Sequence, residues 1–83
     1  DIVELAMLND MDAEIVEFIV NENSKVLDKK IMDLDFPLTG IIGGVIRNNE
    51  GIIALGDFEI KLGDRVLLCS KPESIKKVES LFL

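Results

Sequence analysis

The stretch between residues 40 and 70 alternates short apolar runs with turn signals, and this pattern narrows the possible folds more than any other feature. The apolar runs occupy 41–47, 52–55 and 65–70, with polar and apolar residues alternating over 58–62. The turn signals are Asn-Asn-Glu-Gly at 48–51 and Gly-Asp at 56–57 and 63–64. Runs of this kind, separated by such turns, are typical of strands joined by hairpins. The adjacent glycines at 43 and 44 predict a bulge or a close backbone approach within the first strand.

The first half of the chain carries weaker signals. Residues 13–20 include apolar side chains at helical spacing, but their many β-branched residues favour a strand. Leu27, Ile31 and Leu34 fall at i, i+4 and i+7, which predicts a short helix over 27–34.

A C-terminal helix is predicted from the spacing of the last apolar residues, which are Ile75, Val78, Leu81 and Phe82. Pro72 falls in its expected first turn, and Ser70 and Glu73 have the spacing of a capping box. The whole pattern predicts one α+β domain over 1–83. We expect a small mixed or antiparallel sheet of about four strands, a short helix after the first strand and a helix at the end, in the order β-α-β-β-β-α.

The composition argues against catalysis. The chain has no histidine and a single cysteine, Cys69. This removes the commonest general base, the commonest metal ligand and any internal disulfide. We therefore expect no enzyme, and we expect Cys69 to be a small apolar core residue in a reducing cytoplasm.

Charge and hydropathy restrict the partners. The net charge is −7, the basic residues are scattered, and neither tyrosine nor tryptophan is present. Nucleic acid and anionic membrane surfaces are therefore not expected partners. No apolar run approaches the roughly 20 residues of a membrane span, so no direct membrane insertion is expected. A hydrophobic fraction of 48% in so small a domain predicts strands that are apolar on both faces, or one face covered by another copy.

Several segments, taken in order, resemble the TrkA C-terminal (RCK-C) domain family. They are LTGIIGGVIR at 38–47, GIIALGDFEIKLGDRVLL at 51–68 and IKKVESLF at 75–82, with AEIVEFIV at 13–20 and SKVLDKKIMDL at 24–34 in the first half. The resemblance covers nearly the whole chain. Two departures are Asp28, where the family usually has glycine, and Leu55, where many members have a proline that shapes a ligand pocket.

The resemblance implies a regulatory role. Such domains belong to cytoplasmic subunits of Trk- or Ktr-type potassium uptake systems, at the inner face of the cell membrane, and act on a membrane transporter subunit through the full-length protein. They pair as homodimers, and some bind a cyclic dinucleotide at the dimer interface. NAD or ATP is expected only on a preceding Rossmann-like domain, and the first residue, Asp1, fits a piece of such a longer protein. The alternatives are a structural dimerisation or docking domain without ligand, and a copy within another ion or anion transporter.

The candidate ligand residues lie at the 48–51 hairpin. Arg47 ends an apolar strand, and its guanidinium suits a phosphate or a partner subunit; in ligand-binding relatives the matching arginine makes such contacts. The alternative is a solvated arginine at a strand end. Asn48 and Ile52 are its neighbours across the hairpin and complete the candidate set. Asp57 and Asp64 are weaker candidates for a cation site, because a turn in which Asp64 bonds the local backbone explains Gly63-Asp64 better.

Overall fold

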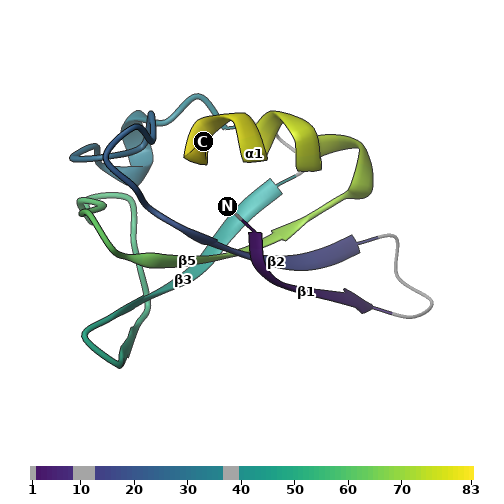
Figure 1. The fold of residues 1–83 in the computed structure, drawn as a ribbon, viewed down its shortest axis with the longest axis horizontal. Helices are drawn as coiled ribbons and strands as arrows, with labels where there is room; N and C mark the ends of the chain where they lie inside the picture. Colours follow the sequence, from purple (N-terminus) through teal and green to yellow (C-terminus); the bar gives the residue numbers. More distant parts are fainter. Residues whose placement is uncertain (1, 9–12, 37–39) are drawn as a thin grey trace.

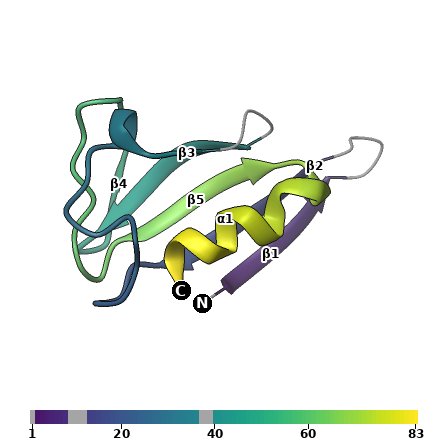
Figure 2. The same ribbon diagram turned by 90° about the horizontal axis from the view of Figure 1, so that it is seen from above.

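Within the described residues, the sheet has five strands, all paired antiparallel in the order β1-β2-β5-β3-β4, and one α-helix covers one of its faces (Figures 1 and 2). This computed structural model describes residues 2–8, 13–36 and 40–83, with side chains from residue 13 onward. The strands are β1 (Ile2–Leu8), β2 (Ala13–Ile19), β3 (Gly40–Arg47), β4 (Glu50–Ile52) and β5 (Arg65–Ser70), and the helix is α1 (Ile75–Phe82).

The predicted α+β class with an antiparallel sheet is confirmed, and so is the strand over 13–20. The register shifts between Ile42 and Gly44, where a bulge was predicted. The hairpin turn is formed by Asn48 and Asn49, both with positive φ, as expected for a tight turn between β3 and β4. The sheet also contains an additional edge strand, β1, which the sequence pattern had not assigned.

The helix predicted over 27–34 was wrong, because this segment forms turns and one short 3₁₀ helix, η1 (Ile31–Asp33). Some of its backbone amides bind the carbonyl three residues earlier, as in tight turns, and others bind a distant segment. The amide of Asp28 donates to the carbonyl of Ile60 at 2.8 Å, and that of Ile31 donates to Phe58 at 3.0 Å. Pairing with 58–60 therefore replaces helical hydrogen bonds, while 58–60 itself forms only a bridge between Lys30 and Glu59 rather than a strand.

The core lies between the sheet and α1. Alternate residues of β2 and β5 point to this side and are buried, and Val78 and Phe82 of α1 pack against them. The rings of Phe18 and Phe82 stack with their centroids 4.7 Å apart. The spacing that predicted α1 is thus confirmed. The predicted capping box is not formed, because the Ser70 hydroxyl donates to the carbonyl of Lys71.

The opposite face of the sheet carries the other set of alternating side chains. Cys69 lies there and is only half buried, so the expectation that it belongs to the core was wrong. Because side chains alternate along a strand, the buried Leu68 and Ser70 point to the core and Cys69 points away from it.

Candidate functional site

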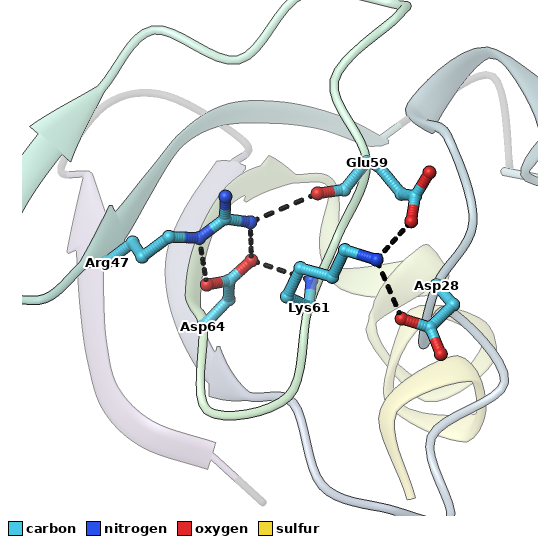
Figure 3. Close-up of polar contacts among 5 residues, drawn as sticks. All are labelled: Asp28, Arg47, Glu59, Lys61 and Asp64. Carbon is cyan, nitrogen blue, oxygen red and sulfur yellow. Dashed lines mark hydrogen bonds and ion pairs between the residues drawn. The ribbon is translucent and has the colours of Figure 1, made fainter.

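Arg47 is fixed by a carboxylate that lies 17 residues further along the chain. Its Nε donates to Oδ1 of Asp64 at 2.8 Å, and its Nη2 donates to Oδ2 at 2.6 Å (Figure 3). Two parallel hydrogen bonds between a guanidinium and a carboxylate set the orientation as well as the distance. This pair ties the end of β3 to the turn that precedes β5.

Asp64 is almost fully buried, with 1% of its side chain exposed. It follows Gly63, whose φ of 83° turns the chain into β5, and its carboxylate also accepts the amide of Lys61 at 2.8 Å. The predicted turn is therefore confirmed. Burial alone would raise the pKa of the Asp64 carboxyl, but the hydrogen bonds from Arg47 and from the Lys61 amide lower that pKa below its ordinary value.

The Arg47 side chain also joins the loop that connects β4 to β5. Its guanidinium carbon lies 4.7 Å from the centroid of the Phe58 ring, and Nη2 donates to the carbonyl of Glu59 at 3.0 Å. The hydrogen bond to Asp64 raises the pKa of Arg47 further. Nη1 makes no hydrogen bond with any residue that the structure describes, and 31% of the side chain is exposed. One end of the guanidinium is thus open to a further acceptor.

A second cation, Lys61, lies close to Arg47 (Figure 3). Its Nζ pairs with Asp28 at 3.1 Å and with the Glu59 carboxylate. These pairs are exposed, and the hydrogen bonds from Nζ to Glu59 and then to Asp28 raise the pKa of Lys61. Lys61 therefore stays positively charged at neutral pH.

Arg47 and Lys61 line one hollow of about 480 Å³. The other lining side chains are the acidic Asp57 and Glu59 and the apolar Ile53, Leu55 and Phe58. The hollow therefore places two cationic and two acidic side chains beside an apolar surface. Leu55, at which the resemblance predicts a pocket-shaping proline, is part of that surface.

Of the three predicted ligand residues, the hollow includes Arg47. Asn48 lies in the hairpin turn with a φ of 52°, and Ile52 pairs with Val45 in the β3–β4 ladder. Both adjoin the hollow along the chain, and their role stays a prediction. Sequence reasoning missed Phe58 and Lys61 as members of the site. The alternating pattern over 58–62 was the available signal, but it was interpreted as a strand.

The proposed cation site is not favoured by this geometry. The carboxylate that Asp64 would offer to a metal is occupied by Arg47, while Asp57 lines the hollow separately. Among the described residues, no group of three or more acidic, cysteine or histidine side chains is placed to hold a metal ion.

The sequence matches a protein-family model over most of the chain. The family model for the TrkA-C domain matches residues 15–83. This chain belongs to the TrkA-C domain family. The predicted resemblance is therefore confirmed.

Curated relatives of this TrkA-C domain are named as potassium uptake proteins. The Trk system potassium uptake protein TrkA homolog of Archaeoglobus fulgidus is 32% identical over 80 residues, which is 96% of this chain and 18% of that protein. The Trk system potassium uptake protein TrkA of Halomonas elongata is 37% identical over 86 residues, covering 99% of this chain and 19% of that protein. The chain thus spans about a fifth of the length of the curated relatives that it matches.

A solved structure supports the fold. It is described as "Structure of RCK domain with cda", and it superposes with a TM-score of 0.71 over 83% of this chain and 97% of that one. The identity is 24%, so the likeness concerns the fold.

Proposed function

We propose that this TrkA-C domain is the regulatory domain of a subunit of a potassium uptake system. In this proposal it pairs as a homodimer and binds a small anionic nucleotide, such as a cyclic dinucleotide, beside Arg47. The names of the relatives and the match to an RCK domain support the regulatory role in potassium transport. Those names are names of transport proteins rather than enzymes, which supports a role without catalysis.

The proposed ligand binding rests mainly on how the Arg47 side chain is held. Asp64 holds its guanidinium over Phe58, and Nη1 is left without a described partner at a hollow that also contains Lys61. A fixed guanidinium loses little side-chain entropy when an acceptor binds, which favours phosphate binding. The apolar wall formed by Ile53, Leu55 and Phe58 suits the face of a base.

The proposed location and partner of the domain are based on the same relatives. We propose that the domain acts in the cytoplasm, at the inner face of the membrane, on a transporter subunit through its full-length protein. NAD or ATP would then bind a preceding Rossmann-like domain. No helix in the described part of the chain is long and apolar enough to cross a membrane.

One observation favours a second candidate, a dimerisation or docking domain without ligand. Asp64 already satisfies two of the donor positions of Arg47, so the arginine has a structural role even in the absence of a ligand. A domain of this kind within another ion or anion transporter would share that role. Ligand titration separates these alternatives from the proposed one.

The test is calorimetric titration of the 83-residue chain with a cyclic dinucleotide, ATP and NAD. We expect binding of the cyclic dinucleotide and at least about tenfold weaker binding by Lys61→Gln, which removes an exposed cation of the hollow. Lys76→Gln changes the same charge on α1, away from the hollow, and should bind as the original chain does. Flat titrations with all three ligands would reject the ligand part and support the docking domain.

A further inference from the structure

Segment 20–32 runs from the end of β2 into η1, and we call it the strap. Figure 1 shows it beside the C-terminal end of α1. Its backbone consists mostly of turns, and its hydrogen bonds reach two places that are distant from each other in the sequence. One is the end of α1. The other is segment 56–61, which we call the wall because it supplies four of the seven side chains that line the hollow beside Arg47.

The first part of the strap binds the last carbonyls of α1. The hydroxyl of Ser24 donates to the carbonyl oxygen of Phe82 at 2.6 Å, and the side-chain amide of Asn21 donates to the same oxygen at 3.2 Å. The backbone amide of Lys25 donates to the carbonyl oxygen of Leu81 at 2.8 Å. The last carbonyls of a helix have no partner within it, and a helix of eight residues is too short to be stable alone. The strap therefore fixes the end of α1.

The second part of the strap holds the wall. The carbonyl of Ile60 accepts the amide of Asp28 at 2.8 Å, and the amide of Ile60 donates to the carbonyl of Lys29 at 2.9 Å. The amide of Met32 donates to the carbonyl of Gly56 at 2.9 Å. The wall belongs to no strand of the described sheet, so these bonds take the place of a β-ladder and set its position.

Arg47 binds the wall from the opposite side. The carbonyls of Phe58 and Ile60 accept amides of the strap, whereas the carbonyl of Glu59 between them accepts Nη2 of Arg47 at 3.0 Å. This alternation is expected in an extended chain, where the backbone groups of successive residues point to opposite sides. A displacement of the strap therefore moves the carbonyl of Glu59 relative to the Arg47 guanidinium and changes the shape of the hollow.

The two parts of the strap are joined by a short, packed stretch of chain. Val26 lies between them and is fully buried in the core. Because protein interiors are close-packed, a buried side chain cannot move without displacing its neighbours. A change at the end of α1 therefore reaches the wall instead of being absorbed by a free loop.

We infer that the strap couples the C-terminal end of α1 to the hollow beside Arg47, with Ser24 as the positioning residue. While Ser24 binds the carbonyl of Phe82, the strap holds the wall against Arg47. When this contact opens, the wall loosens and the hollow loses its shape. The effect on ligand affinity rests on the proposed function, because it concerns the same hollow. By reciprocity, a ligand in the hollow stabilises the end of α1.

Hydrogen exchange of the 83-residue chain, followed residue by residue by NMR, tests the coupling without a ligand. Ser24→Ala should accelerate exchange of the Asp28 and Ile60 amides by about tenfold, and the amides of β5 much less. Ser80→Ala is the matched control, because the Ser80 hydroxyl also donates to a helix carbonyl, that of Lys77 at 2.6 Å, but on the exposed side of α1. It should leave the Asp28 and Ile60 amides unchanged.

Two results of this experiment would overturn the inference. One is an equal acceleration of the β5 amides in Ser24→Ala, which would mean a general loss of stability. The other is unchanged exchange at Asp28 and Ile60. Asn21→Ala guards against misfolding of Ser24→Ala, because it removes the longer of the two side-chain bonds to Phe82. It should accelerate the same two amides by about threefold, and no local acceleration in either variant would also overturn the inference.

A cyclic dinucleotide supplies the reciprocal test. Its binding should slow exchange of the Lys25 amide, and Ser24→Ala should bind it about threefold or more weakly than Ser80→Ala does. Ligand binding without these effects would overturn the inference but leave the proposed function intact. Flat titrations combined with local acceleration in Ser24→Ala would reject the ligand part of the proposed function and support the coupling within the chain.

Discussion

Asp64 is the residue on which the geometry of the candidate site depends. Replacing it with asparagine keeps the shape of the side chain but turns one acceptor into a donor that faces the Arg47 guanidinium. We expect Asp64→Asn to lower the free energy of unfolding by about 2–3 kcal/mol at pH 7, less than for a fully buried pair because Arg47 is partly exposed. Urea unfolding measures this change in the free energy of unfolding. The same change at the exposed Asp57 should cost less than about 0.5 kcal/mol, and equal losses at both positions would contradict this account.

The pH dependence of this difference has a definite sign. The pKa of Asp64 is lower in the folded chain than in the unfolded one, so its stabilisation is present above about pH 4 and is lost as the pH falls through the folded value. Arg47 stays charged throughout this range. The stability difference between the original chain and Asp64→Asn should therefore shrink below about pH 4. A constant difference down to pH 2 would show that the ion pair contributes little.

Asp28, for which the resemblance predicts glycine, adopts a left-handed backbone with a φ of 61°. Glycine enters this conformation without the steric cost that other residues bear. Asp28→Gly should raise the free energy of unfolding by about 0.5–1 kcal/mol, since the exposed Lys61 pair that it removes contributes little. Thermal unfolding tests this, with Asp57→Gly as the control, because Asp57 lacks a positive φ and should lose stability.

The aromatic stack joins α1 to the sheet, which makes Phe82 the decisive residue of this element. Phe82 is fully buried against Phe18. Its replacement by alanine should lower the free energy of unfolding by about 3–5 kcal/mol, as measured by chemical denaturation. Leu83 is the next residue and is exposed, so Leu83→Ala should cost below about 0.5 kcal/mol. Comparable losses would mean that α1 does not complete the core.

Some elements were predicted correctly from the sequence and others were not. The difference depends on whether the backbone hydrogen bonds of an element join residues near to or far from each other in the chain. Local signals predicted α1 and the β3–β4 hairpin, because their bonds are short-range. The segment 27–34 was mistaken for a helix because several of its amides bind carbonyls within 56–60, and no local pattern reveals such partners. Arg47 was predicted as a site residue from its place at a strand end. Asp64 was predicted as a turn residue and as a weaker cation-site candidate, but not as the partner of Arg47, since their meeting depends on the β3–β5 register and its bulge.

At the scale of the whole molecule, the proposed dimer and the proposed ligand are linked. If a ligand binds the dimer more tightly than the monomer, it must strengthen the dimer by the corresponding factor. The hollow beside Arg47 lies at the end of β3, which pairs with β5 inside the sheet.

Sedimentation equilibrium of the 83-residue chain, with and without a saturating cyclic dinucleotide, tests the central claim most directly. We predict a reversible dimer in the micromolar to submillimolar range and a dissociation constant that falls by about fivefold or more when the ligand is added. The Lys61→Gln variant should form the same dimer but respond less to the ligand. A chain that remains monomeric at submillimolar concentration, with or without the ligand, would contradict the claim.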